Sequence, residues 1–140
     1  MKTCVVVFAR EPVPGRVKSR LAEGIGAEAA AEVYKATLEH TLEIAKSSGA
    51  RVVMSLADVP SGAWARSIDT AVEIQRGEDI GDRMDDAFAR RFGEGENRVI
   101  IIGSDCPWSA ATHIVRASAK LGGIDAVFGP TNDGGYWLVA

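Results

Sequence analysis

The sequence predicts an α/β fold, a three-layer sandwich in which helices cover a mostly parallel sheet. Residues 4–9 (CVVVFA) and 98–102 (RVIII) are continuous apolar runs rich in β-formers. Such runs are typical of central strands that are covered on both faces. Expected strands and amphipathic helices alternate along the chain, as in a sheet with crossover helices. With 140 residues the chain has room for one hydrophobic core.

The first expected strand, residues 4–9, leads into an expected loop at residues 10–26. This loop is punctuated by residues that break regular structure, namely Pro12, Pro14, Gly15, Gly24 and Gly26.

The strongest helix is predicted at residues 27–48. Apolar side chains recur there every three or four positions and form the expected buried stripe. The stripe consists of Val33, Tyr34, Leu38, Thr41, Leu42 and Ala45. Lys46 near the helix end suits the helix dipole, and Gly49 ends the helix.

The middle of the chain alternates in the same way. Residues 51–56 form the second expected strand and residues 71–75 a weaker third strand. Between them a short helix is expected at residues 61–67, capped by Ser61. A second good helix follows at residues 80–92, with acidic residues early, arginines late and an apolar stripe. The late arginines are Arg90 and Arg91, and the stripe is Met84, Phe88 and Phe92.

The last part contributes a strand at residues 98–102, a helix at residues 109–121 and strands at residues 124–128 and 136–139. The chain stops inside the last expected strand. Two interpretations follow: the domain, residues 1–140, ends on an edge strand, or it lacks a C-terminal segment.

Composition excludes several classes of protein. The net charge of −3 argues against a broadly basic nucleic-acid surface. Cys4 and Cys106 form no CxxC pair, so neither a disulfide scaffold nor a zinc ribbon is expected. The apolar run at the N-terminus is too short for a signal peptide, and no run approaches the roughly 18 apolar residues of a membrane span. We therefore expect a cytoplasmic protein with reduced thiols.

Ligands of open α/β sheets bind beyond the carboxyl ends of the strands, and the first segment expected there is the loop REPVPGRVKSR, residues 10–20. Its four cations are Arg10, Arg16, Lys18 and Arg20. With one acid among them, the loop carries a net charge of +3 in a chain of net charge −3. This concentration favours an anionic ligand such as a phosphate, and Gly15 permits a close backbone approach. The alternative is a solvated basic loop. Neither a Walker loop nor a dinucleotide GxGxxG motif is present.

Two further segments carry candidate acids. Residues 103–107 (GSDCP) place Asp105 after a buried strand, where a carboxylate suits a divalent cation; the alternative is that Asp105 caps a turn or the next helix. Residues 129–136 (GPTNDGGY) carry Asp133, whose alternative role is a hairpin turn, because Asp-Gly is a strong turn signal. Arg83, in the helix start GEDIGDRM, could reach a ligand; its alternative is a surface ion pair.

Four motifs in this order resemble one protein family: FAREPVPGRVKSRLA, GEDIGDRM, IIIGSDCP and GPTNDGGYWLV. They resemble the small glycosyltransferase-A-like family of radical-SAM/selenodomain-associated transferases, within the nucleotide-diphospho-sugar transferase superfamily. The likeness spans nearly the whole chain. VKSRLA is also similar to the loop that 2-phospholactate guanylyltransferases use on a nucleoside triphosphate.

The resemblance implies a glycosyltransferase-A fold with a Rossmann-like sheet, a nucleotide or nucleotide-sugar donor and Mg²⁺ or Mn²⁺. It implies that the basic loop with Gly15 holds the nucleotide phosphates and that Asp105 binds the metal. Asp133, Gly134 and Gly135 would line the sugar or acceptor side, with Asp133 acting on the acceptor hydroxyl.

Two functional hypotheses follow. The first is a transferase that moves a glycosyl or nucleotidyl group from a nucleotide donor, with a divalent metal, to an acceptor that the sequence does not identify. The second is a non-catalytic or truncated nucleotide-binding or partner module of the same fold, for which a homodimer through an unfinished edge strand is expected.

Overall fold

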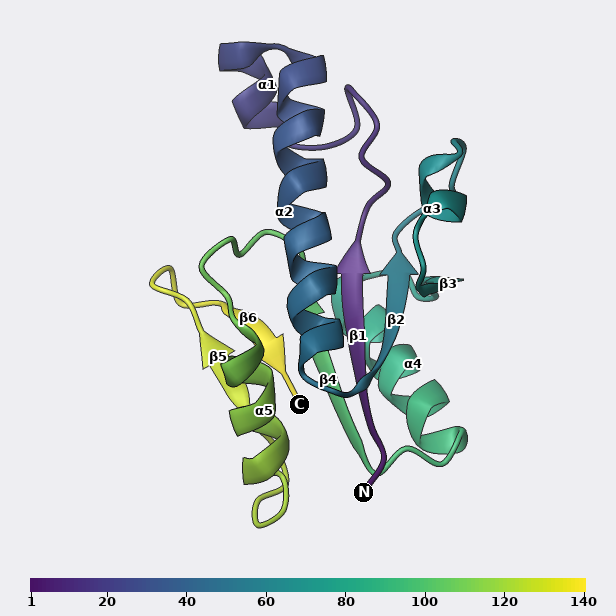
Figure 1. The fold of residues 1–140 in the computed structure, drawn as a ribbon, viewed down its shortest axis with the longest axis vertical. Coiled ribbons are helices and arrows are strands. Elements are labelled where there is room, and N and C mark those ends of the chain that lie inside the picture. Colours follow the sequence, from purple (N-terminus) through teal and green to yellow (C-terminus); the bar gives the residue numbers. More distant parts are fainter.

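The computed structural model describes residues 1–140 and confirms the predicted α/β class, with helices on both faces of a six-stranded sheet (Figure 1). The strands are β1 (Thr3–Ala9), β2 (Arg51–Leu56), β3 (Ala71–Ile74), β4 (Arg98–Gly103), β5 (Phe128–Pro130) and β6 (Tyr136–Val139). The helices are α1 (Ser19–Ile25), α2 (Ala27–Ser47), α3 (Trp64–Ser67), α4 (Ile80–Gly93) and α5 (Ala111–Lys120). None of these helices combines the length and the apolar character that a membrane span requires.

The sheet is mostly parallel, and its strand order is β3-β2-β1-β4-β6-β5. β1 pairs in parallel with β2 and with β4, and β2 pairs in parallel with β3. β6 is antiparallel to both β4 and β5. The chain moves from β1 to β2 and β3 on one side, then crosses to β4 on the other. The carboxyl ends of β1 and β4 therefore form a topological switch point, the usual ligand position in open α/β sheets.

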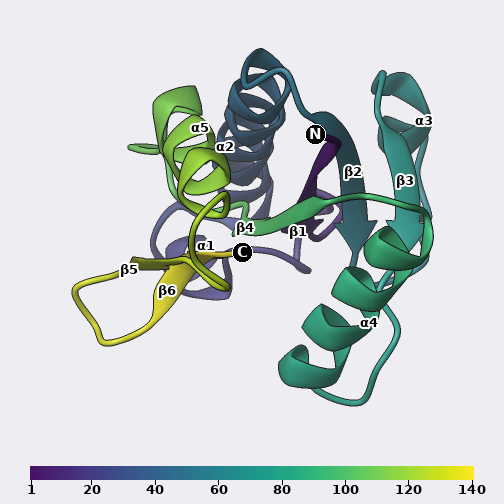
Figure 2. The ribbon, with the colours of Figure 1, turned by 90° about the horizontal axis from the view of Figure 1, so that it is seen from below.

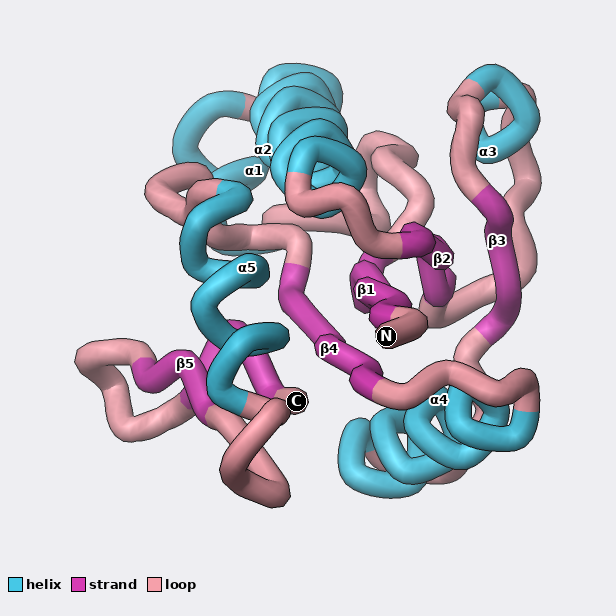
Figure 3. The backbone as a smooth tube through the Cα atoms, turned by 60° about the horizontal axis from the view of Figure 1, so that its bottom comes forward, coloured by secondary structure: helices cyan, strands magenta, loops and turns pink.

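Two apolar clusters hold the layers together, one on each face of the sheet. On one face, α2 and α5 pack through residues such as Leu38 and Ile114 against alternate side chains of β1 and β4 (Figure 2). On the other face, α4 packs through Ala87 against Val6 and Ile101. Figure 3 shows the sheet between these helices. The apolar strands thus bury both faces, as predicted for a covered sheet.

An ionic cluster fastens α4 to β3. Arg91, of which only 3% is exposed, donates to the carboxylate of Glu73 in β3 at 2.8 Å. Arg90 donates to the same carboxylate at 3.0 Å and also pairs with Asp86 in its own helix. The two arginines therefore do more than complement the helix dipole: they fix the position of α4 against the sheet edge.

The N-terminal half departs from expectation in two places. The expected loop at residues 10–26 contains α1, because the run SRLAE favours a helix and Gly24 costs it only about 1 kcal/mol. Within α2, Val33 is exposed while Ala30 and Ala31 are buried, because Val33 lies at the edge of the face that meets the sheet.

The short third helix also differs from its prediction. It begins at Trp64, and Ser61 does not cap it. The backbone N–H groups of Ser61 and Gly62 instead donate to the carboxylate of Glu11, at 2.6 and 2.7 Å. The acid of the basic loop thus binds the segment before α3. In α4, Phe92 is exposed and stacks on Phe88 at the surface rather than joining the core.

The C-terminal part shows three differences. α5 begins at Ala111, because the Ser109 hydroxyl donates back to the Cys106 carbonyl at 2.7 Å instead of capping the helix. The fifth strand is Phe128–Pro130 rather than residues 124–128, because its register is set by antiparallel pairing with β6. β6 lies between β4 and β5, so the first of the two interpretations, that the domain ends on an edge strand, is wrong.

Candidate functional site

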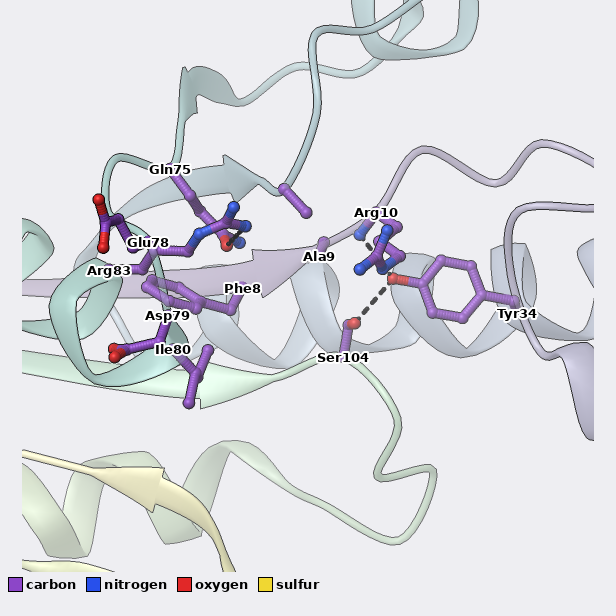
Figure 4. Close-up of a pocket in the computed structure, with 11 residues that line it drawn as sticks. Phe8, Ala9, Arg10, Tyr34, Gln75, Glu78, Asp79, Ile80, Arg83 and Ser104 are labelled. Carbon is purple, nitrogen blue, oxygen red and sulfur yellow. Dashed lines mark hydrogen bonds between the residues drawn. The ribbon is translucent and has the colours of Figure 1, made fainter.

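A cavity of about 440 Å³ lies at the switch point of the sheet (Figure 4). Its walls come from the ends of β1 and β4, the segments after β2 and β3, the start of α4, and Tyr34 of α2. The lining residues are Phe8, Ala9, Arg10, Tyr34, Ala57, Gln75, Glu78, Asp79, Ile80, Arg83 and Ser104. Arg10, Tyr34 and Ser104 lie at one end, and the residues around the start of α4 lie at the other.

A hydrogen-bonded chain joins β1, α2 and β4 at the first end. The backbone N–H of Arg10 donates to the Tyr34 hydroxyl at 2.9 Å. The Tyr34 hydroxyl lies 2.8 Å from the Ser104 hydroxyl. Both side chains are more than nine-tenths buried. Tyr34 was expected only as part of the apolar stripe of its helix, but its polar tip ties the two central strand ends together.

Lys18 and Asp105 come together across this end of the sheet. Lys18 Nζ lies 2.5 Å from Asp105 Oδ1, and 26% of the Lys18 side chain and 62% of the Asp105 side chain are exposed. Lys18 is also the chain's one non-glycine residue with a left-handed backbone (φ 53°, ψ 48°). Asp105 directly follows Ser104, which lines the cavity, whereas Lys18 and Asp105 are not themselves lining residues.

The other predicted phosphate-binding residues are more dispersed. Arg10 lines the cavity, and its side chain also pairs with Asp58 at 3.2 Å. Arg16 and Arg20 are exposed, have no ion pair and do not line the cavity. Gly15 has a φ of +84° in a turn closed by the Arg16 N–H bond to the Val13 carbonyl at 3.0 Å. The turn therefore accounts for a glycine at position 15, because its backbone there is left-handed.

At the other end, Arg83 faces the cavity instead of forming the surface ion pair that was its alternative. Its Nε donates to the Gly77 carbonyl at 3.1 Å, and its Nη1 donates to Gln75 Oε1 at 3.2 Å. Gln75 Nε2 donates in turn to the Ser55 carbonyl at 2.9 Å. Gly77 has a φ of +140°, and a Cβ there would lie 2.8 Å from the Arg83 backbone nitrogen. Only glycine lets the loop approach α4 so closely.

Asp133 lies in the turn between β5 and β6, where the alternative interpretation placed it. Its Oδ1 accepts hydrogen bonds from the Thr131 hydroxyl and, at 3.1 Å, from the Gly135 N–H. The bond from Thr131 is the main cause that lowers the pKa of Asp133. Gly134 has a φ of +89°, as the turn requires. These residues do not line the cavity.

Contacts nevertheless link the three predicted segments. The Lys18–Asp105 pair joins the first segment to the second. The Trp108 and Trp137 rings, which follow the second and third segments, pack edge to face with centroids 5.1 Å apart. Sequence reasoning missed Ser104, Gln75 and Asp79 as lining residues, although each lies just beyond a strand or before a helix, where a ligand-binding position is expected.

The donor set limits what metal the chain can hold. No three His, Cys, Asp or Glu side chains converge to hold a metal ion. Asp105 supplies one exposed carboxylate, beside which Lys18 lies. Mg²⁺ commonly takes one or two protein carboxylates and completes its coordination with water and phosphate oxygens. The residues therefore fit a metal that binds together with a phosphate, and do not fit one that the protein holds alone.

The fold matches solved structures. One is from Desulfovibrio desulfuricans G20 and is described as a candidate nucleotide-diphospho-sugar transferase; it is 30% identical, with a TM-score of 0.92. The match covers 99% of this chain and 63% of that one. Rv0371c of Mycobacterium tuberculosis H37Rv was solved alone and in complex with manganese. The complex is 18% identical with a TM-score of 0.57, and the match covers 99% of this chain and 70% of that one. The structure of Rv0371c alone is 17% identical with a TM-score of 0.62, and the match covers 99% of this chain and 71% of that one.

These likenesses confirm a fold of the nucleotide-diphospho-sugar transferase type. At the identities of the two Rv0371c structures, the likeness concerns the fold alone. Comparison with curated proteins found no match. The family described as "uncharacterized protein conserved in bacteria" (DUF2064) matches residues 37–140, and the chain belongs to this family.

Proposed function

We propose that residues 1–140 form a single transferase domain that binds a nucleotide-diphospho-sugar and transfers its glycosyl group to an acceptor. The Lys18–Asp105 contact carries this proposal, because it joins the basic loop and a strand-end carboxylate beside a cavity at the switch point. The description of the Desulfovibrio protein supports the choice of donor.

The charges of the cavity suggest how the donor lies. The cations Arg10 and Lys18 are found at one end, each paired with an aspartate, while Glu78 and Asp79 outnumber Arg83 at the start of α4. Carboxylates repel phosphate but accept hydrogen bonds from hydroxyl groups. The phosphates would therefore lie towards Lys18, and the uncharged, hydroxyl-bearing nucleoside towards α4 and Arg83.

The residues have distinct roles in this proposal. Lys18, with Arg10 and the exposed side chains of Arg16 and Arg20, neutralises charge on the departing phosphate. Asp105 would hold Mg²⁺ or Mn²⁺ together with the phosphates, and such a metal would supply stabilisation of the charge on phosphate oxygens. Asp133 orients the acceptor hydroxyl, with Gly134 and Gly135 on the same side.

The basic loop also favours a second candidate. Its likeness to the loop of guanylyltransferases suggests nucleotidyl transfer from a nucleoside triphosphate, which would use the same phosphate-binding residues. Incubating the chain with nucleoside triphosphates, and separately with nucleotide sugars, and then detecting released pyrophosphate or nucleoside diphosphate would distinguish the two reactions.

A thermal-shift panel tests the binding step. Ligands that bind only the folded state stabilise it, by about 2.7 kcal/mol at a concentration 100 times Kd. We expect nucleoside diphosphates to raise the Tm of the wild-type chain in the presence of Mn²⁺ and to raise it less in Asp105→Asn. The absence of any nucleotide effect, with or without Mn²⁺, would refute the proposal. Binding without turnover would favour a non-catalytic module.

A further inference from the structure

The hydrogen bonds at the switch point leave one hydroxyl proton without an acceptor in the protein. Three polar groups meet there: the Arg10 backbone N–H, the Tyr34 hydroxyl and the Ser104 hydroxyl. The first can only donate, so Tyr34 Oη accepts its hydrogen bond. The direction of the remaining bond, between the two hydroxyl groups, decides what Ser104 can offer a ligand.

The acidity of the phenol favours one direction. Ser104 Oγ is the other polar atom that the Tyr34 hydroxyl contacts, and both side chains are similarly buried and line the cavity. A phenol is more acidic than an aliphatic hydroxyl and is the better donor of the two, while the serine oxygen is the better acceptor. Tyr34 therefore donates to Ser104. The proton of Ser104 is then free, because the structure gives that hydroxyl no other partner.

The free proton belongs to a side chain that lines the cavity. Ser104 is 8% exposed, so little of it is open to bulk water. Arg10 lines the same end, and Asp105 with its partner Lys18 follows directly in the chain. A hydrogen bond to an ionised acceptor is stronger than one to a neutral acceptor, so this donor suits an anionic oxygen.

We propose that the Ser104 hydroxyl donates a hydrogen bond to a phosphate oxygen of the bound nucleotide, and that Tyr34 is the positioning residue that directs its proton. This inference rests on the proposed function and adds two residues to its phosphate-binding end. Tyr34 itself does not need to touch the nucleotide, because it acts through Ser104.

Calorimetric titrations with and without the phosphates test the assignment. The probes are ADP, CDP, GDP and UDP with Mn²⁺, and the nucleoside of whichever diphosphate binds the wild-type chain most tightly. Ser104→Ala is expected to weaken the diphosphate about tenfold or more, as for a lost hydrogen bond to a charged acceptor, and to leave the nucleoside within about twofold. Ser104→Thr keeps the hydroxyl and is expected to retain affinity. Tyr34→Phe is expected to weaken only the diphosphate, by a smaller factor, because Ser104 then loses its orientation.

The outcomes separate this inference from the proposed function. If the wild-type chain binds none of the four diphosphates, the proposed function is wrong and this assignment falls with it. If the wild-type chain binds but Ser104→Ala binds equally well, or loses the nucleoside equally, only the Ser104 assignment is overturned. Thermal unfolding of each variant shows whether it is folded, and Ser104→Thr provides the test should Ser104→Ala unfold.

Discussion

Replacing Lys18 by methionine separates a binding role of the Lys18–Asp105 pair from a structural one. The Asp105 side chain of this pair is 62% exposed, and exposed ion pairs contribute at most about 1 kcal/mol to the free energy of unfolding. For a chain of this size such a loss corresponds to a fall in Tm of about 4 °C. The left-handed backbone at this position costs a side chain about 1–2 kcal/mol. Lys18→Gly, which removes that strain and loses the amine, is therefore expected to be about as stable as the wild type.

Lys18→Met should have a much larger effect on ligand binding than on stability. A hydrogen bond to a charged group contributes about 1.5–3 kcal/mol, so Lys18→Met should weaken nucleoside diphosphate binding about 10- to 150-fold. Urea denaturation measures the stability and isothermal titration calorimetry the affinity. Lys120→Met is the matched control, because this exposed lysine ends α5 and lies outside the cavity. A variant that loses more than about 2 kcal/mol of stability and keeps its affinity would show that the pair is structural and that the reasoning is wrong.

Three further predictions concern the fold around the site. Gly77→Ala should lower the unfolding free energy by about 1–3 kcal/mol in urea denaturation, because its Cβ would lie 2.7–2.9 Å from atoms of α4; unchanged stability would contradict this. Glu73→Gln should cost about 1.5–3 kcal/mol by the same assay, because buried Arg91 would lose the closer of its two carboxylate partners and keep only Glu94, at 3.0 Å; a loss under 1 kcal/mol would show that Glu94 alone is sufficient. In an NMR titration the Asp133 carboxyl should titrate below its ordinary pKa of 3.8, and Thr131→Val should raise its pKa. Because folding lowers this pKa, the charged carboxylate stabilises the folded state at pH values above the pKa of the unfolded state. That stabilisation is lost as the pH falls through the pKa of the folded state.

The central strands were predictable because their burial leaves a local signature. β1 and β4 are apolar on both faces, and this pattern appears wherever a strand is covered on both sides. α3 and β5 were misplaced because their bounds depend on partners far away in the sequence. Glu11 binds the segment before α3, and the register with β6 determines where β5 begins.

The site was predictable to the extent that strand ends predict ligand positions. Lys18 and Asp105 could be expected to approach each other, because their loops follow adjacent strands of one sheet. Tyr34 could not be assigned in this way, because the helical spacing that placed it in the core says nothing about its hydroxyl. The sequence left two interpretations open for Arg83. The hydrogen bonds that hold its side chain towards the cavity go to Gly77 and Gln75, which lie in a loop with no periodic pattern.

The environment of Asp133 limits the part that it can play in the proposed transfer. Two hydrogen bonds to its carboxylate stabilise the charged form, and the resulting lower pKa makes it a weaker base than an ordinary aspartate. A base that removes a proton from an acceptor hydroxyl works best with a pKa raised towards the working pH. In the proposed reaction Asp133 is therefore better suited to hold the acceptor hydroxyl in place than to deprotonate it. In that case the barrier to bond cleavage would be lowered chiefly by charge stabilisation at the other end of the donor, where Lys18, Arg10 and Ser104 would contact the phosphates.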